Sequence, residues 1–166
     1  MDHIGRTHPM TTDPHGSSRA LVEQWLSAIA VATAWRQRGL SLWTRGSEHK
    51  LVLVLERSPW VNAYYPRLGL YLDADDPRGS ASSADVAFDV VLKEVVALAE
   101  LDRALNFEQF SLDELQRRSI VELVVERQII PLANTLFTRE GLIGFLRETK
   151  SELEVPIWTR QRLGLA

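Results

Sequence analysis

The chain has 166 residues, a formal net charge of −3 at pH 7 and no cysteine, which corresponds to about one domain at ~150 residues per domain. Hydrophobic residues make up 45% of the chain and charged residues 25%, a globular composition that excludes a disordered, collagenous or rod-like protein. The lack of cysteine excludes disulfides, thiolate nucleophiles, iron–sulfur clusters and cysteine-based zinc sites. The slightly acidic balance argues against nucleic acid as the partner, since nucleic-acid binders usually carry a basic excess.

Residues 1–17 are polar and are punctuated by proline and glycine. They hold neither the apolar core of a signal peptide nor the Arg-rich pattern of a transit peptide, and no apolar run in the chain reaches the ~18 residues of a membrane span. We therefore expect a disordered tail over residues 1–17, a single domain over residues 18–166, no membrane contact and a cytoplasmic location. Whether the natural start is Met1 or Met10 stays open.

The first element expected after the tail is a helix. Ser17 and Ser18 offer N-caps, and apolar residues then recur at helical spacing to about Gln37. Gly39 follows two arginines, which is typical of a helix C-terminus.

Strand-like segments follow this helix. Residues 40–45 and 49–57 flank a short turn and predict a hairpin, and a third strand is expected over about residues 61–73. Residues 51–55 are apolar on both faces, so we expect the second strand to be central and covered on both sides. An acidic, Gly- and Ser-rich loop over residues 73–83 precedes a fourth strand over about residues 86–97, whose second half also has helical spacing.

Two helices are expected in the last third of the chain, after an irregular stretch over residues 101–110. Ser111 and Glu114 have the spacing of a capping box ahead of a helix to about residue 130, which Pro131 would kink or end. Thr138 caps a last helix to about Lys150, and residues 155–166 read as a tail. The order helix, four strands, helix, helix predicts an α+β fold: an antiparallel sheet of about four strands with the helices packed on it.

Several segments share the pattern of a known family. They are RQRGLSLWTR at 36–45, LVLVLERS at 51–58, PRLGLYL at 66–72, IPL at 130–132, TREGL at 138–142 and RLGL at 162–165. Together they resemble the domain of unknown function family 4304 over most of residues 20–165. Where that family ends its aliphatic strand in a Gln-Lys-Ser-like triplet, this chain has Glu56, Arg57 and Ser58. The family carries no established activity, so the resemblance implies a fold and no mechanism.

The residues offer little for catalysis. His49 is the only histidine outside the tail, and Glu48 beside it faces the other way in a strand, so an exposed hairpin histidine is expected. The acidic run at residues 73–76 lacks the glycine and glutamate of a calcium loop. Gly141 and Gly144 belong to no phosphate loop and are expected to allow close helix packing. We expect no catalytic residue, no metal and no other cofactor.

Aromatic residues and arginines gather in the first three strands and their loops. Trp43 and Tyr71 alternate with Leu42 and Leu70, so they lie on the face opposite the leucines. Aromatic and arginine side chains are enriched at interaction hot spots. We therefore predict a non-enzymatic protein–protein interaction module, of which a small immunity-type protein is one specific form. The candidate binding residues are Trp43, Arg45, Arg57, Trp60, Tyr64, Tyr65, Arg67 and Tyr71.

Three alternatives stay open. The first helix, which carries Trp25 and Trp35, could cover the aromatic face and make it core. The same residue types serve single-stranded nucleic-acid platforms, against which the net charge argues. A small enzyme or ligand-binding protein would instead use a pocket formed by Trp43, His49, Glu56 and Tyr71.

Overall fold

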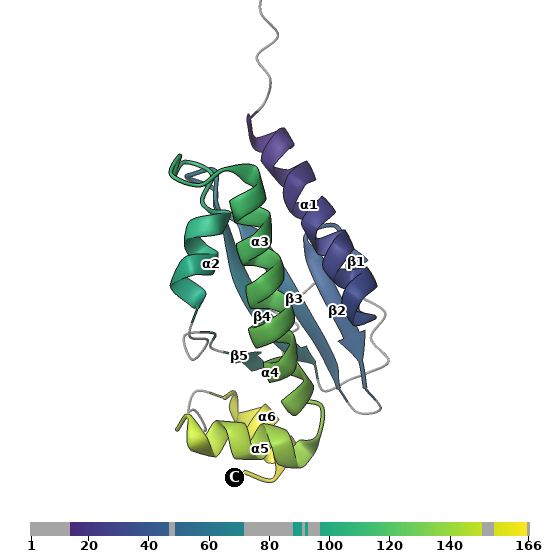
Figure 1. The fold of residues 1–166 in the computed structure, drawn as a ribbon. Helices are drawn as coiled ribbons and strands as arrows, with labels where there is room; N and C mark the ends of the chain where they lie inside the picture. Colours follow the sequence, from purple (N-terminus) through teal and green to yellow (C-terminus); the bar gives the residue numbers. More distant parts are fainter. Residues whose placement is uncertain are drawn as a thin grey trace, which may run out of the picture.

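An antiparallel sheet with helices on one face forms the structure, a computed structural model that describes residues 14–46, 49–71, 88–90, 92, 97–150 and 155–165 (Figure 1). Five strands pair in sequence order. Their bounds are β1 Arg36–Arg38, β2 Ser41–Arg45, β3 Lys50–Arg57, β4 Tyr64–Tyr71 and β5 Phe88–Val90. The predicted α+β class and the order of its elements are confirmed.

The helices come before and after the strands, as expected. Helix α1 precedes the sheet and α2 to α4 follow it; α5 and α6 lie at one end of the sheet in Figure 1. Their bounds are α1 Pro14–Thr33, α2 Leu98–Leu105, α3 Glu114–Val124, the π-helical segment η2 Val125–Ile129, α4 Ile130–Thr135, α5 Arg139–Glu148 and α6 Ile157–Leu163.

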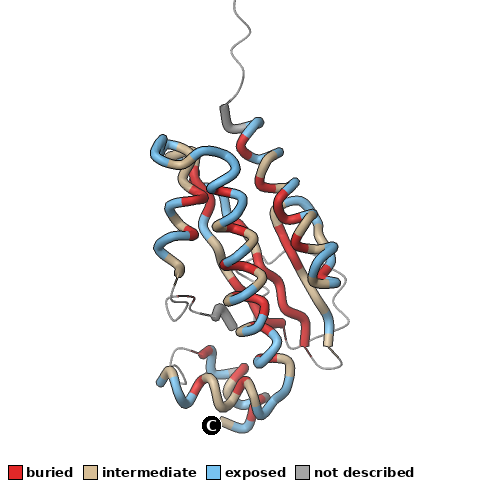
Figure 2. The backbone as a smooth tube through the Cα atoms, in the orientation of Figure 1, coloured by how far each residue is buried: buried red, intermediate tan, exposed pale blue. Residues whose placement is uncertain are grey.

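The register separates two faces of the sheet. Leu42, Leu53 and Leu68 form one row across β2, β3 and β4, and these leucines belong to the core beneath the helices. The next row, which points to the other face, contains Trp43 and Val52. Figure 2 shows the buried residues running along the central strands and the inner sides of the helices. Alternation of side chains along each strand therefore produces a leucine face under the helices and a second face that carries Trp43.

The first helix ends earlier than the spacing predicts. Helix α1 stops at Thr33, and Ala34 takes a left-handed backbone conformation with φ 59°. The Gln37 side chain donates to the Glu23 carbonyl of α1 at 2.8 Å, which ties β1 to the helix. Gly39, with φ 55°, lies in the β1–β2 turn and does not cap the helix. At the other end α1 already begins at Pro14, inside the stretch expected as tail.

Two segments expected to be irregular are helical. Residues 98–105 form α2, which buries Leu101, Ala104 and Leu105 on one side, so packing overrides a weak local pattern. The expected tail contains α6, which ends at Gly164 in the left-handed region with φ 73°. Arg139 of α5 donates from Nη2 to the carbonyl of Leu163 at 2.9 Å and holds this short helix in place.

Helix α3 passes through η2 into α4 without a break. The Ile130 N–H bonds to the Val125 carbonyl, five residues back, and this wider turn directly precedes Pro131. Since proline has no N–H and its ring crowds the preceding turn of an α-helix, the wider turn accommodates it. The sequence predicted that Pro131 would kink or end this helix, and the structure shows that the helix does not end there but continues to Thr135.

Some expectations fall on parts of the chain outside the described residues. These are the tail over residues 1–13, the acidic loop over residues 73–83, and residues 86, 87, 91 and 93–96 of the expected fourth strand. Within the described ranges, none of the helices combines the length and the apolar character needed to cross a bilayer.

Candidate functional site

Two loops lie together at one end of the sheet and form what we call the loop end: residues 58–63, between β3 and β4, and residues 106–113, between α2 and α3. The Phe107 N–H donates to the Asn62 carbonyl at 2.8 Å, and the Asn62 N–H donates to Oε1 of Glu108 at 2.9 Å. Ser18 Oγ near the start of α1 donates to Oδ1 of Asn62 at 2.7 Å. The two loops and α1 are therefore held to one another by direct hydrogen bonds.

Arg117 of α3 holds the second of these loops in place through hydrogen bonds from its side chain. Its side chain is buried, and its guanidinium carbon lies 5.0 Å from the ring centroid of Phe107. Among the described residues, the acceptors that it binds are backbone carbonyls near the C-terminus of α2 or in the loop, where the last carbonyls of a helix lack intrahelical partners. These carbonyls belong to Arg103, Ala104, Asn106, Gln109 and Leu112. Burial lowers the pKa of Arg117 from its usual value, although an arginine stays charged.

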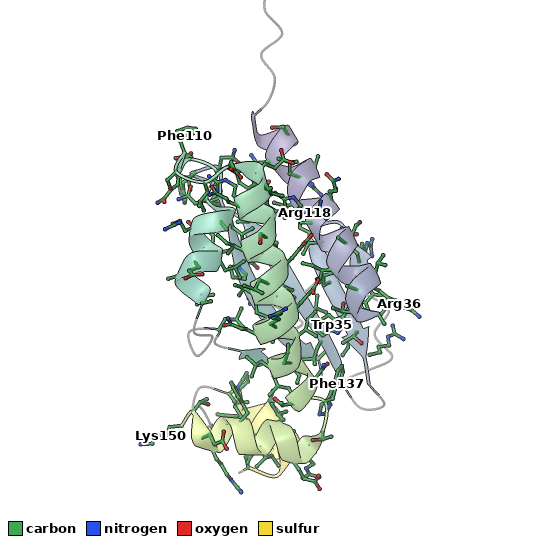
Figure 3. All side chains as sticks on the ribbon, viewed as in Figure 1. Trp35, Arg36, Phe110, Arg118, Phe137 and Lys150 are labelled. Atoms are coloured by element: carbon green, nitrogen blue, oxygen red, sulfur yellow. The ribbon has the colours of Figure 1, made fainter. Side chains whose placement is uncertain are left out.

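Large apolar side chains project from the loop end into solvent. Trp60 is 90% exposed and Phe110 is 93% exposed, and Figure 3 shows Phe110 at the upper end of the molecule. Leu115 in the first turn of α3 is 75% exposed and Tyr65 at the start of β4 is half exposed. The Trp60 and Val61 N–H groups both donate to Ser58 Oγ, which closes the turn that carries the indole.

Shallow hollows flank these side chains. One of about 390 Å³ lies along α3 between Leu112, Leu115 and Ile120, and a neighbouring one of about 240 Å³ shares Leu112 and reaches Phe110. The loop end therefore continues into an apolar surface on α3.

On the other side of the loop end, a hollow of about 350 Å³ is lined by Tyr65, Asp102 and polar residues of α2 and its following loop. Burial raises the pKa of Asp102 above the usual value for a carboxyl group.

Two of the predicted residues, Trp43 and Arg45, lie far from the loop end on β2, beside Arg36 of β1. The guanidinium carbons of Arg36 and Arg45 lie 5.1 and 5.5 Å from the ring centroid of Trp43. Thr44 and Ala34 complete a hollow of about 280 Å³ beside them. We call Arg36, Trp43 and Arg45 the arginine–tryptophan site.

The structure does not place the eight predicted binding residues on one surface. Tyr64 is buried in the core on the leucine face, edge-on to Phe107. On the opposite face, the ammonium of Lys50 lies 4.8 Å from the ring centroid of Tyr71 where β3 begins and β4 ends, and Nη1 of Arg67 lies 2.8 Å from Oε1 of Glu56. Trp60, Tyr65 and Arg57 lie at the loop end or beside it, while Trp43 and Arg45 belong to the arginine–tryptophan site.

Helix α1 packs on the leucine face. Trp25 and Trp35 are core residues, and Trp25 stacks against Phe107 with ring centroids 6.0 Å apart. Val52 and Tyr71 are also buried, but they lie on the opposite face and outside that core cluster.

The structure does not bring together the residues of the pocket that the ligand-binding alternative requires. His49 and Glu56 lie at opposite ends of β3, about 23 Å apart at the usual rise per strand residue. His49 is buried, contrary to the expected exposed hairpin position, and within the described part of the chain neither ring nitrogen has a hydrogen-bond partner. The Gly46 N–H donates to the His49 carbonyl at 2.7 Å and a Cβ at Gly46 would meet the Phe137 ring, so the chain between α4 and α5 packs against this hairpin end. That contact is long-range, which explains why the hairpin pattern alone did not predict it.

Phe110, Leu115, Arg36 and Arg117 were missed in the sequence. Phe110 stands alone among polar neighbours, which is the only local signal for an exposed aromatic there. Arg117 resembles any other arginine on an amphipathic helix, because its acceptors come from elsewhere in the chain.

The comparisons with known proteins found no relative of this chain. No family model, no curated protein and no solved structure matches the chain. Within the described part of the chain, no group of three or more His, Cys, Asp or Glu side chains is placed to hold a metal ion.

Proposed function

We propose that the chain is a non-enzymatic protein-interaction module that binds its partner through the loop end, with Trp60 and Phe110 as the central contacts. The observation that carries the proposal is the exposure of both aromatic side chains, 90% and 93%, on two loops that are hydrogen-bonded to each other. Large aromatic rings gain much free energy when a partner buries them, and aromatic anchors dominate interface energetics.

The rigidity of the loop end supports the same function. Arg117 binds the carbonyls of Asn106, Gln109 and Leu112, so the loop that carries Phe110 is fixed before any partner arrives. A preorganised loop loses less conformational entropy on binding than a floppy one. Such a surface suits a small inhibitory or immunity-type protein, which acts through one rigid contact and needs no catalytic group.

The test compares three tagged forms of the full chain. They are the natural chain, a double variant with Trp60→Ala and Phe110→Ala, and a control with Val31→Ala and Ile157→Ala. The control removes two exposed apolar side chains, 88% and 66% exposed, from the C-terminal part of α1 and from α6. Circular dichroism and urea denaturation first establish that all three forms fold alike.

Each form then captures proteins from an extract of its source organism, which are quantified by mass spectrometry. At least one protein, after purification, is expected to bind the natural chain and the control directly and to bind the double variant at least about tenfold more weakly. If every protein captured by the natural chain binds the double variant equally well, the loop end is not the interaction surface.

A further inference from the structure

The hollow of about 350 Å³ beside the loop end lies between the start of β4 and helix α2. In the described residues, β5 pairs with residues 68–70 of β4 and leaves the start of β4 without a strand on its outer side. Helix α2 contacts β4 (Figure 1), and an isolated bridge between Ala63 and Asn106 holds the C-terminal end of the helix at the start of the strand. The hollow therefore lies where a helix takes the place of a neighbouring strand.

The hollow brings an aromatic ring and a carboxylate together. Tyr65 is half exposed, and Asp102 of α2 is partly buried. A guanidinium group matches this pair, because its flat face stacks on an aromatic ring while the N–H groups at its edge donate to both oxygens of a carboxylate.

Asp102 lacks a cation in the part of the chain that the structure describes. Its side chain forms no ion pair and no hydrogen bond there, and burial, with no contribution from a neighbouring charge, raises its pKa. A carboxylate that has lost part of its water without gaining a partner is at a free-energy disadvantage. A cation that enters the hollow removes this disadvantage, and little further water must leave Asp102 when the cation binds.

Arg103 also lines the hollow but does not neutralise Asp102. Consecutive side chains of an α-helix point in directions about 100° apart, and no ion pair joins these two among the described residues. Arg103 is exposed, so solvent and salt screen its charge more strongly than that of the partly buried Asp102. The field inside the hollow therefore favours a cation.

The buried Arg117 makes the hollow rigid on its loop side. Its guanidinium donates to the carbonyls of Asn106, at 2.8 Å, and of Gln109, and both of these residues line the hollow. Gln109 directly precedes Phe110, and Tyr65 lies near the start of the strand that follows the Trp60 loop. The hollow is thus continuous with the loop end, and one partner can contact both.

We propose that the hollow receives an arginine side chain of the protein partner, with the guanidinium group between the Asp102 carboxylate and the Tyr65 ring. The inference rests on the proposed function, because the arginine belongs to the partner that the loop end binds. Charge complementarity and continuity with the exposed aromatic residues support this source. Arginine, like tryptophan and tyrosine, is enriched among the residues that dominate interface energetics.

A capped tripeptide, acetyl-Ala-Arg-Ala-amide, tests the hollow without the rest of the partner. Chemical-shift changes in ¹H–¹⁵N spectra of the full chain at low salt give the residues contacted and the dissociation constant. A second peptide has citrulline in place of arginine, which keeps the shape and removes the charge. The variants are Asp102→Asn and Tyr65→Leu. Glu100→Gln is the matched control, because it removes the same charge from the same helix outside the hollow.

The arginine peptide is expected to shift the signals of the residues that line the hollow and to bind at least about fivefold more tightly than the citrulline peptide. Asp102→Asn is expected to weaken its binding at least about fivefold and Tyr65→Leu about threefold. Glu100→Gln is expected to bind within about twofold of the natural chain. Asp102→Asn removes a charge that burial disfavours, so unfolding does not explain its weaker binding.

Three results would overturn the inference. One is equal weakening by Asp102→Asn and Glu100→Gln, which would mean only non-specific charge attraction. Another is tighter binding of acetyl-Ala-Glu-Ala-amide, which would mean an anion site at Arg103, or of spermidine, which would mean a site for a free polyamine. The third is that the arginine peptide leaves the signals of the lining residues unchanged.

The tripeptide experiment separates this inference from the proposed function. The Trp60→Ala, Phe110→Ala double variant is expected to bind the arginine peptide as the natural chain does, because both side chains lie outside the hollow. Failure of the tripeptide to bind therefore overturns the arginine site and leaves the aromatic contacts of the loop end to their own test.

Discussion

The guanidinium of Arg117 donates from Nη1 to the carbonyl of Ala104 at 2.8 Å, near the C-terminal end of α2. The same guanidinium also donates to carbonyls of the loop that follows α2. The buried Arg117 side chain therefore links α3 to α2 and to the loop that carries Phe110. The arrangement neutralises a buried charge with backbone dipoles, which are strongest where helix carbonyls are left unpaired.

Removal of this side chain is expected to be costly. Arg117→Met keeps the apolar stem but leaves several carbonyls without their donor, so the free energy of unfolding is expected to fall by about 3 kcal/mol. Arg118→Gln, which loses only an exposed ion pair with Glu122, is expected to change it by less than about 1 kcal/mol. Urea denaturation measures the free energy of unfolding of both variants. If both lose less than about 1 kcal/mol, the contacts of Arg117 with the carbonyls contribute little to stability.

The start of α3 offers a direct comparison between two possible capping boxes. The structure forms the box from Asp113 and Gln116, whose side chains accept from each other's N–H groups at 2.8 and 2.9 Å. The spacing of Ser111 and Glu114 predicted another box, two residues earlier. Asp113→Ala is expected to lower the free energy of unfolding by about 1 kcal/mol and Ser111→Ala to leave it nearly unchanged. The reverse order in urea denaturation would favour the earlier box.

Two glycines of α5 are expected to respond in opposite ways to alanine. A Cβ at Gly141 would clash with the Thr135 carbonyl oxygen, whereas a Cβ at Gly144 would meet no atom of the described residues within 4 Å. Gly144→Ala is therefore expected to raise the free energy of unfolding by about 0.5–1 kcal/mol through better helix propensity. Gly141→Ala is expected to lower it by about 1–3 kcal/mol, since a backbone atom must move. Thermal unfolding that shifts in the same direction for both would contradict these contacts.

The burial of Asp102 is expected to make the stability of the fold depend on pH. Burial raises the pKa of this carboxyl above 3.8 in the folded chain, so the folded state holds the proton more tightly than the unfolded state does. The contribution of Asp102 to the free energy of unfolding is favourable below the pKa of the unfolded chain. It is lost as the pH rises through the pKa of the folded chain. Asp102→Asn, which is always neutral, is expected to raise the Tm at neutral pH and to lose this advantage below the ordinary carboxyl pKa.

The control for this effect is Glu100→Gln, an exposed carboxylate in the first turn of the same helix. This substitution is not expected to raise the Tm at neutral pH, because a negative charge is favourable at a helix N-terminus. A gain from Asp102→Asn that is equally large in acid and at neutral pH would have a cause other than its ionisation.

The strands of the sheet were largely predictable because their pattern is local. Alternating leucines in β3 and β4 determine which face packs under the helices, and the short turn before β3 determines the hairpin partner. Helix α2 was not predictable in the same way, since its three buried residues reveal a helix only when the sheet and α3 are present. The early end of α1 likewise depends on the Gln37 contact with Glu23, fourteen residues away in sequence.

The candidate site was only partly predictable for the same reason. Tyr64 and Tyr65 are neighbours of the same chemical type, and strand register alone decides that Tyr64 is buried while Tyr65 stays half exposed. Trp60 was predicted because it belongs to the aromatic residues that gather in the first strands and their loops. Phe110 joined it only after the hydrogen bonds between the two loops were known.

The measurement that tests the central claim most directly is the affinity of the purified partner for the natural chain, for Trp60→Ala and for Val31→Ala, determined by isothermal titration calorimetry. If the loop end is the interaction surface, Trp60→Ala weakens binding by about 30-fold, the effect of losing an aromatic hot spot, and Val31→Ala leaves it unchanged. Equal affinities of the natural chain and of folded Trp60→Ala would contradict the account.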